Sequence, residues 1–373
     1  MKSNRYVIYH LHTDPKFITL ENAFDINIFD NRFIFIDTHK LAHEYTFPYN
    51  DIQIFERTSG SLDEIVKLVN NADLLIIYGL EMNKAYICNK VNKKVPIIWR
   101  FFGSELYDQM YHDMHSKYTL DVLDNKHIDI RHRLSKLFSN IFLYGFNYKR
   151  LIPNTYFRAD AIACLYYEEY LFLSKRFHLP TFLQIPYEEN NESIPYLKKE
   201  GIIIIGNSRN KSNNHIDILK IIMPYENYDY ILPFNYGEIS SYSKAVTLQT
   251  EHHSNFTVVR NFLPLEEYIQ MFKSSAAFVF NAYRQMAMGN IFIALRNNVK
   301  IYLNKKNSAY DWFISNGFYV STIDRLENDL KTGKIYQTEN EYYRNIHALQ
   351  KLTVKYNNRD FVDKIIQIIS KQQ

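Results

Sequence analysis

Residues 201–220 read GIIIIGNSRNKSNNHIDILK: four isoleucines, a glycine, a polar loop and a return to helical apolar spacing. The isoleucine run is too short for a helix and too apolar for an exposed edge, so it predicts a buried parallel strand. Ser212 or Asn213 can cap the helix that follows. The stretch therefore predicts a strand, a loop of small residues and a helix, which is the repeating unit of doubly wound α/β domains.

This loop has the composition of an anion-binding turn. Gly206 lets the backbone approach a ligand closely, while Asn207, Ser208, Arg209 and Asn213 supply polar groups around it. The first free N–H groups of the next helix point to the carboxyl end of the strand, where the helix dipole favours a phosphate. The alternative is an ordinary turn between a strand and a helix, with no ligand.

A second loop repeats this pattern. The stretch FNAYRQMAMGN, residues 280–290, carries Arg284 and Gln285 ahead of a helix expected to begin near Gly289 and Asn290. A guanidinium offers a planar fork of donors that suits a phosphate. The alternative for the arginine is a surface salt bridge.

A third loop, LPFNYGE, places Asn235, Tyr236 and Gly237 after another strand. Taken singly, its glycine indicates no more than turn geometry. Three such loops at the carboxyl ends of one sheet indicate a shared ligand.

Strand-like and helical runs alternate along the whole chain, which predicts parallel sheets flanked by helices. Residues 1–190 are expected to form one Rossmann-like domain and residues 201–338 a second, with the polar stretch 187–201 as linker. Residues 339–373 are expected to be helical and to pack back across both domains. The predicted strands are 6–11, 33–37, 72–79, 95–103, 159–165, 181–187, 201–206, 228–234, 256–259, 276–280, 299–304 and 318–322.

The length, composition and charge of the chain indicate a globular protein and do not indicate nucleic-acid binding. The 373 residues, 46% of them hydrophobic, suffice for two cores, and a net charge of +4 permits anionic ligands without indicating nucleic acid. Cys88 and Cys164 lie in apolar surroundings without metal-ligand spacing, which favours buried thiols in a reducing cytoplasm. The first residues lack the apolar core of an export signal. We expect a cytoplasmic protein.

Two Rossmann-like domains facing across a cleft are the plan of GT-B glycosyltransferases. The chain resembles the TDP-N-acetylfucosamine:lipid II N-acetylfucosaminyltransferases, glycosyltransferase family 56, of enterobacterial common antigen assembly. The resemblance spans most of the chain and is densest in GNSRNKSNNHIDIL, LPFNYG, NFLPLEEYIQMFKSSAAFVFNAYRQMAMGN and VKIYLNKKNSAYDW. In the first half, HLHTDP and WRFFGSELY are similar to family segments, with His12, Phe102 and Glu105 as departures on the acceptor side.

The resemblance implies transfer of a deoxy-amino sugar, such as a 4-acetamido-4,6-dideoxyhexose, from a TDP- or UDP-linked donor to a polyprenyl-diphosphate-linked saccharide. Helix N-termini and Arg284 would stabilise the leaving diphosphate without a metal, and no cofactor is expected. His215, at the helix start, is either structural or faces the phosphate. The expected donor-binding residues are Gly206, Asn207, Ser208, Asn213, His215, Asn235, Tyr236, Gly237, Arg284, Gln285, Gly289 and Asn290.

Two carboxylates follow strands of the first domain, Asp14 and Glu105. If the reaction inverts the anomeric centre, one of them is a candidate base for the acceptor hydroxyl. The alternative for Asp14 is a residue that forms the turn before Pro15, and the alternative for Glu105 is an acid that caps a helix. A two-lobed nucleotide or sugar binding protein without turnover is the alternative function; nucleic-acid binding lacks a clustered basic module.

A basic and aromatic stretch indicates where the protein works. Residues 131–154, RHRLSKLFSNIFLYGFNYKRLIPN, combine five cations with a wide apolar surface and are too charged to span a bilayer. Such a helix would lie on the anionic inner leaflet of the plasma membrane, near a lipid-linked acceptor. The alternative is a helix whose apolar face packs on the first sheet.

Overall fold

The computed structural model of the chain describes residues 5–18, 23–38, 45–49, 51–123, 130–187 and 195–371. The chain divides into two compact units, each built on its own parallel β-sheet. The predicted α/β class with two Rossmann-like domains is therefore confirmed. The first unit holds Met1–Glu105, Ile128–Glu188 and Lys355–Gln373, and the second holds Leu106–His127 and Glu189–Val354.

The sheet of the first unit has the strand order β3-β2-β1-β4-β5-β6-β7 in the described part of the chain. All pairs are parallel, so the carboxyl ends of the strands share one edge. Six of these strands match predicted ranges; β3 was not predicted, because its four residues are exposed or half-buried and give no apolar run. The strands are β1 (Tyr6–His12), β2 (Phe29–Asp37), β3 (Gln53–Glu56), β4 (Leu74–Tyr78), β5 (Ile97–Arg100), β6 (Ala161–Cys164) and β7 (Thr181–Gln184).

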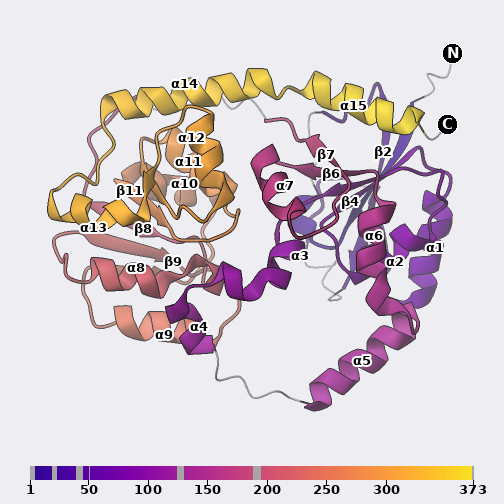
Figure 1. Cartoon of the computed structure of the whole chain (residues 1–373), viewed down its shortest axis with the longest axis horizontal. Helices are drawn as coiled ribbons and strands as arrows, with labels where there is room; N and C mark the ends of the chain where they lie inside the picture. The colour runs from indigo at the N-terminus through magenta and orange to yellow at the C-terminus, as the bar shows by residue number, and fades with distance from the viewer. Residues whose placement is uncertain are drawn as a thin grey trace. The chain divides into compact units, whose positions relative to one another are not determined.

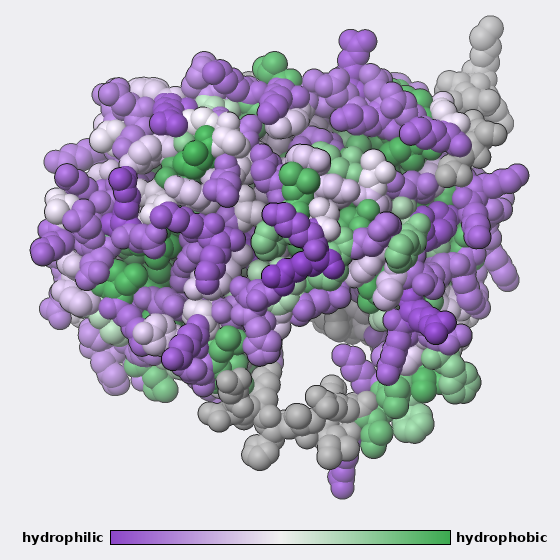
Figure 2. All heavy atoms as spheres, in the orientation of Figure 1, coloured by the Kyte–Doolittle hydropathy of each residue, from purple (hydrophilic) through white to green (hydrophobic). Residues whose placement is uncertain are grey.

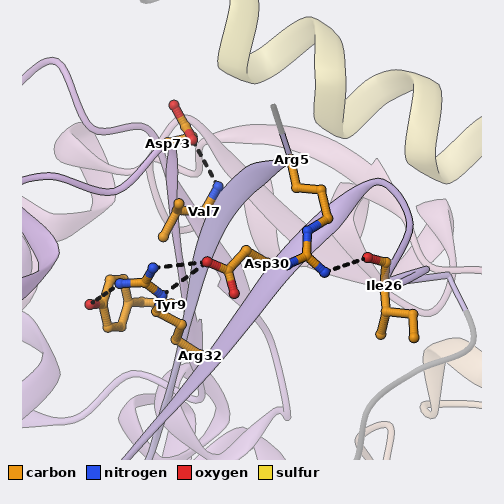
Figure 3. Close-up of polar contacts among 7 residues, drawn as sticks. All are labelled: Arg5, Val7, Tyr9, Ile26, Asp30, Arg32 and Asp73. Atoms are coloured by element: carbon orange, nitrogen blue, oxygen red, sulfur yellow. Dashed lines mark hydrogen bonds and ion pairs between the residues drawn. The ribbon is translucent and has the colours of Figure 1, made fainter. Parts of the chain in front are cut away.

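Side chains hold β1 in register with its neighbours (Figure 3). The Val7 N–H donates to Asp73 Oδ2 at 2.8 Å, which joins β1 to the turn before β4. Arg32 on β2 donates to Asp30 Oδ2 at 2.8 Å and to the Tyr9 hydroxyl at 3.3 Å. Because Tyr9 and Arg32 are paired across the two strands, these contacts fix the alignment of β1 with β2.

Helices cover both faces of this sheet. On one face, α2 packs against α1 and α6. On the other, Phe361, Ile365 and Ile369 of α15 share an apolar core with Ile8 and Ile76. The helices of this unit are α1 (Ser59–Val69), α2 (Met82–Lys90), α5 (Ile130–Tyr144), α6 (Leu151–Arg158), α7 (Tyr167–Ser174) and α15 (Asn358–Ser370), while α3 (Ser104–Tyr107) crosses the boundary between the units.

The second sheet has the order β10-β9-β8-β11-β12-β13, again wholly parallel. All of its described strands match predicted ranges, since each is an apolar run between turns. They are β8 (Ile202–Ile205), β9 (Asp229–Pro233), β10 (Phe256–Val259), β11 (Ala277–Phe280), β12 (Lys300–Leu303) and β13 (Ser321–Thr322).

Helices α8 and α13 pack together on one face of this sheet, and α10 packs with α11 on the other (Figure 1). Alternate side chains of β11 face the two layers: Ala277 and Val279 lie in the core with α8, while Phe278 contacts Phe272 of α10. The helices are α4 (Lys117–Leu123), α8 (His215–Ile222), α9 (Ser241–Thr250), α10 (Leu265–Ser274), α11 (Met288–Arg296), α12 (Ser308–Ser315), α13 (Ile323–Lys331) and α14 (Glu339–Lys355).

The two units differ from the predicted ranges 1–190, 201–338 and 339–373. Residues 106–123 group with the second unit, because Leu123 enters its core and the Ser116 N–H donates to Asn214 Oδ1 at 2.8 Å. The C-terminal segment is helical and is shared: α14 up to Val354 groups with the second unit and α15 with the first. Sequence order alone does not show such exchanges.

Candidate functional site

The loop after β8 is shaped around a glycine. Gly206 has φ +67°, and a Cβ there would lie 2.4 Å from His215 Nε2 and 3.0 Å from Asn213 Oδ1. Its N–H donates to the Val279 carbonyl of β11 at 2.9 Å, which continues the sheet into the loop. Only glycine combines this backbone conformation with so close an approach of the histidine ring.

Asn213 builds this loop from within. Its Oδ1 accepts the Asn207 N–H at 3.1 Å, and its Nδ2 donates to the Asn210 carbonyl at 3.0 Å. Ser208 is fully buried, and its hydroxyl is 3.3 Å from Asn213 Nδ2. The side chains of Asn213 and Ser208, predicted as donors to a ligand, therefore shape the loop whose backbone would contact the ligand.

Helix α8 begins at His215, later than the predicted cap at Ser212 or Asn213. Residues Lys211–Asn213 form a 3-10 turn, and Asn214 takes the N-cap position with φ 48° and no side-chain capping bond. Asn214 instead accepts from the Ser116 N–H, and its Nδ2 lies 3.1 Å from the Asn281 carbonyl. The first N–H groups of α8 thus receive no side-chain cap from the N-cap residue.

His215 is fully buried at this helix start. Its Nδ1 lies 3.0 Å from the Tyr242 hydroxyl, which also accepts the His215 N–H at 2.6 Å. Its Nε2 has no hydrogen-bond partner among the described residues and is directed at Gly206. Burial lowers the pKa of His215 to about 3, so the ring is neutral at physiological pH. Tyr242 was not predicted, because its only sequence signal is its place in a helix after β9.

The loop after β11 buries an arginine. Arg284 is 7% exposed, its Nε has no partner among the described residues, and its guanidinium carbon lies 5.7 Å from the centre of the Tyr107 ring. Gln285 beside it is also buried. Tyr107 was not predicted here, because it comes from the segment that sequence order assigns to the other domain.

Helix α11 also begins without a side-chain cap. Ala287 occupies the N-cap position with φ 56°, and the helix starts at Met288. Gly289 and Asn290 therefore lie in the first turn, as predicted. Asn290 Nδ2 donates to the Tyr268 hydroxyl at 2.8 Å, and nothing lies within 4 Å of a Cβ built on Gly289. The N-termini of α8 and α11 belong to neighbouring strand–helix units of one sheet.

The loop after β9 packs against the loop after β8. Asn207 Nδ2 donates to the Tyr236 hydroxyl at 2.5 Å, and the Arg209 N–H donates to the Tyr236 carbonyl at 3.1 Å. Gly237 has φ +100° and lies against the backbone of Arg209. Asn235 Oδ1 is buried without a partner among the described residues. Because β9, β8 and β11 are adjacent and parallel, the three predicted loops meet at one edge of the second sheet.

Glu105 is bound by the first unit itself. Its Oε1 accepts from the Leu80 N–H at 3.2 Å, the Phe102 N–H at 3.2 Å and Trp99 Nε1 at 3.3 Å. Burial raises the pKa of this carboxyl above its ordinary value, although these bonds oppose the shift. Through these contacts, Glu105 joins the loops that follow β4 and β5.

Asp14 is half-buried in the turn after β1. A lysine that sequence analysis missed lies close to it: Lys84 of α2 is 2% exposed, and its Nζ donates to Thr13 Oγ1 at 2.9 Å and to the Tyr78 carbonyl. Burial lowers the pKa of Lys84, while Asp14 and Glu105 oppose that shift through their charges. Within the described ranges, no group of three or more His, Cys, Asp or Glu side chains is placed to hold a metal ion.

Comparison with solved structures shows the same overall fold. Sucrose-phosphate synthase from Thermosynechococcus elongatus matches with a TM-score of 0.67 at 10% identity, over 98% of this chain and 99% of that one. A structure described as trehalose-6-phosphate from E. coli bound with UDP-2-fluoro glucose matches with a TM-score of 0.60 at 8% identity, over 98% and 99% of the two chains.

An alpha-glucosyltransferase in complex with UDP-glucose and DNA containing an abasic site matches with a TM-score of 0.56 at 10% identity, over 98% of this chain and 99% of that chain. These neighbours are GT-B glycosyltransferases, and identities this low show the fold alone. The predicted GT-B class is therefore confirmed.

Sequence comparison identifies the family. No curated protein matches the chain. The family model described as 4-alpha-L-fucosyltransferase, glycosyl transferase group 56, matches residues 162–372, more than half of the chain and including all three loops of the second unit. The chain belongs to glycosyltransferase family 56 and is a nucleotide-sugar glycosyltransferase.

Proposed function

We propose that the diphosphate of the donor binds in the second unit, between the loop Gly206–Ser208 and the loop from Arg284 to Asn290. The observation that carries this proposal is the pair of neighbouring helices, α8 and α11, whose N-cap residues Asn214 and Ala287 provide no side-chain cap. The dipole at a helix N-terminus favours an anion, although the first N–H of α8, that of His215, is already bound by the Tyr242 hydroxyl. The partly unpartnered guanidinium of Arg284 adds a buried positive charge at the same edge of the sheet.

His215 has a defined part in this site. The Tyr242 oxygen accepts the backbone N–H of His215, so the hydroxyl proton of Tyr242 can be donated to His215 Nδ1. That bond selects the tautomer with a proton on Nε2, which then points at Gly206 as a donor. Because Gly206 has no side chain, its backbone can approach this nitrogen closely. As the bond between the sugar and the diphosphate breaks, these donors stabilise the growing negative charge without a metal.

The description of the family supports a proposal for the donor sugar. A group described as 4-alpha-L-fucosyltransferases supports a 6-deoxyhexose donor. We propose a deoxy-amino sugar of the 4-acetamido-4,6-dideoxyhexose type, transferred to a polyprenyl-diphosphate-linked saccharide during assembly of a surface polysaccharide such as enterobacterial common antigen. A panel of UDP- and TDP-linked sugars, scored for turnover and for slow release of free nucleotide, tests the donor. Absence of nucleotide release from every member of the panel would contradict the assignment.

The base, if the reaction inverts, is assigned to Asp14, with Glu105 as a positioning residue. Asp14 is half-buried and lies beside Thr13, which Lys84 holds, whereas Glu105 already accepts three N–H donors. NMR of the product determines whether the anomeric centre inverts. If it does, Asp14→Asn is expected to abolish transfer and retain nucleotide binding. Glu105→Gln keeps an acceptor oxygen and is expected to retain both, whereas Glu105→Ala is expected to cost about 2 kcal/mol or more of stability.

We propose that α5 attaches the protein to an anionic membrane surface on the cytoplasmic face. Its outer side chains include Leu134, Phe138 and Phe142, which are 49%, 68% and 82% exposed, and Phe146 beyond its end is 87% exposed. Figure 2 shows this apolar surface as a green area at lower right, over α5. A surface this apolar is unusual on a protein that meets only water.

The charges beside this surface favour lipid as its partner. Lys136, Lys149 and Arg150 are exposed. Near anionic headgroups, each would add about 1 kcal/mol to the free energy of membrane binding. Arg131 is exposed as well, while the side chain of Arg133 lies outside the described residues. In the part of the chain that the structure describes, no helix is long and apolar enough to cross a bilayer.

Co-sedimentation with vesicles tests this surface. The chain is expected to pellet with vesicles that contain phosphatidylglycerol and to be released by salt. Replacing Phe138, Phe142 and Phe146 with serine is expected to abolish pelleting. Phe262→Ser, at a phenylalanine of the second unit that is 83% exposed, is the matched control and is expected to pellet like the native chain. Equal recovery in the supernatant with and without anionic vesicles would contradict the proposal.

A further inference from the structure

A groove runs along β7, the edge strand of the first unit. Two cavities, of about 310 Å³ and about 420 Å³, open between β7 and α15, and Phe182 and Lys364 line both of them. One cavity extends to Gln184 and Asp360, at the carboxyl end of β7 and the start of α15. The other extends to the amino end of β7 and to Lys371, just past the end of α15. This β7–α15 groove therefore follows the whole strand, with α15 beside it (Figure 1).

The backbone of β7 has one side that does not pair with the sheet. In the described part of the chain, β7 is the last strand of its sheet and pairs with β6 alone. The Ile185 N–H, just after β7, donates to the Cys164 carbonyl of β6 at 3.1 Å. Since alternate residues of a strand direct their N–H and C=O groups to the same side, those of Phe182 and Gln184 point away from β6. An edge of this kind can pair with a further strand.

The two faces of the groove differ in chemistry. Leu183 shares an apolar core with α15, so the side chain of Phe182, the next residue, lies on the opposite face. There the ring of Tyr167 of α7, which is 49% exposed, has its centre 5.1 Å from that of Phe182. On the α15 side, Lys364 and Lys371 line the groove. A strand added to β7 would turn alternate side chains to the aromatic rings and to the lysines.

The available charge of the groove is positive. Lys364 and Lys371 are exposed. The two acids that line the groove already have partners. Asp360 lies in the first turn of α15, where the helix dipole favours an acid, and its Oδ2 is 3.3 Å from Asn357 Nδ2. Asp160 Oδ2 accepts a backbone N–H at 2.8 Å. The lysines therefore favour a partner that brings carboxylates.

We propose that the β7–α15 groove binds an extended acidic peptide of a partner protein, which adds to β7 as a further strand. Its backbone bonds to Phe182 and Gln184, its apolar side chains pack on Tyr167, and its carboxylates pair with Lys364 and Lys371. A second copy of this chain is disfavoured, because it would bring the same lysines against these. None of the residues proposed for the donor lines the groove, so this inference is independent of the donor site.

Fluorescence polarisation on the full chain tests the proposal, with two labelled peptides as probes. One peptide alternates valine and glutamate, and the other alternates valine and lysine. The native chain is expected to bind the glutamate peptide at least tenfold more tightly than the lysine peptide. N-methylation of the internal residues of the glutamate peptide removes its N–H donors and is expected to abolish binding, whereas a peptide held by its charges alone would still bind.

Lys364→Glu combined with Lys371→Glu is expected to reverse the preference, so that this chain binds the lysine peptide at least tenfold more tightly than the glutamate peptide. Lys93→Glu combined with Lys94→Glu is the matched control and is expected to keep the native preference. Both of these lysines are exposed and precede β5, which β6 separates from β7.

Four results would overturn the proposal. They are no binding of the glutamate peptide at about 1 mM, equal binding of the two peptides, undiminished binding of the N-methylated peptide, and an unchanged preference in the chain with both charges reversed. A native chain that sediments as a dimer, when the charge-reversed chain does not, would also overturn it, because the occupant would then be a second copy.

Discussion

Asn214 and Asn281 exchange hydrogen bonds across the edge of the second sheet. Asn214 Nδ2 donates to the Asn281 carbonyl at 3.1 Å, and Asn281 Nδ2 donates to the Asn214 carbonyl at 3.2 Å. Asn281 Oδ1 also accepts from Asn304 Nδ2 at 2.7 Å. The start of α8 is thereby tied to the end of β11, so the two loops of the proposed diphosphate site are held at a fixed separation.

Removing this tie is expected to affect stability and binding together. Asn281→Ala deletes the donor to the Asn214 carbonyl and the acceptor of Asn304 Nδ2 and leaves buried polar groups unpaired, at a cost of about 2–3 kcal/mol in the free energy of unfolding. Because the loops lose their common support, UDP affinity is expected to fall as well. Urea unfolding and calorimetry measure the two effects.

Asn255→Ala is the matched control for this variant. Asn255 donates to the Tyr228 carbonyl at 2.9 Å, at the amino end of the same sheet. It is expected to cost about 1 kcal/mol of stability and no UDP affinity. A loss of UDP affinity equal to that of Asn281→Ala would contradict a specific role for the Asn214–Asn281 pair.

Gly206→Ala is expected to disrupt the site directly. The added methyl group would lie 2.4 Å from His215 Nε2 on a backbone with φ +67°, so the ring and the loop must both shift. A loss of about 2 kcal/mol or more in unfolding free energy is expected, together with loss of UDP binding. Gly289→Ala, where the new methyl group meets nothing within 4 Å inside a helix, is expected to stabilise the chain by up to about 1 kcal/mol. Equal effects of the two substitutions on stability would refute this account of Gly206.

Because of His12, the folded chain is expected to become less stable as the pH falls. The side chain of His12 is 1% exposed, and its two ring nitrogens have no hydrogen-bond partner among the described residues. Its ring stacks on the ring of Tyr78, with the two ring centres 4.0 Å apart. Burial, and then the charges of His10 and Lys84, lower the pKa of His12 to about 2. Between pH 6.5 and 2 the unfolded chain therefore holds one proton more than the folded chain, and stability is lost as pH falls through this range.

The size of the effect follows from the shift. By pH 5 the loss due to His12 is about 2 kcal/mol. His12→Phe removes it, so the drop in unfolding free energy between pH 7 and pH 5 is expected to shrink by that amount in urea titrations. His252→Phe, at a side chain that is 83% exposed, is the matched control. An unchanged drop in the His12→Phe chain would show that this ring is not held neutral by burial.

Most strands of the two sheets could be predicted from the sequence, because a buried strand is an apolar run between two turns. Ile202–Ile205 is the clearest example. The exception, Gln53–Glu56, is stabilised by pairing with β2 and not by burial of its own side chains. The placement of residues 106–123 was also missed, since it depends on contacts such as Ser116 with Asn214 that are far apart in sequence.

The residues of the candidate site could be singled out from the sequence where a residue type is unusual at its place in a strand–loop–helix unit. Gly206, a glycine directly after a buried strand, and Arg284, an arginine in such a loop, are the two examples, and their anion-binding role stays a prediction. The residues that orient them were not readable. Tyr242 beside His215 and Tyr107 beneath Arg284 carry no local signal, and only the folded chain brings them there.

The most direct measurement is the affinity of Arg284→Ala for UDP and dTDP by calorimetry. Arg296→Ala is the control, because Arg296 comes from the same stretch of chain and its Nε is also buried without a partner among the described residues, but it lies in the last turn of α11. If the diphosphate binds between the loops after β8 and β11, Arg284→Ala weakens both nucleotides at least tenfold and Arg296→Ala changes them less than twofold. Unchanged affinity in Arg284→Ala, with the native chain binding UDP or dTDP, would contradict the central claim.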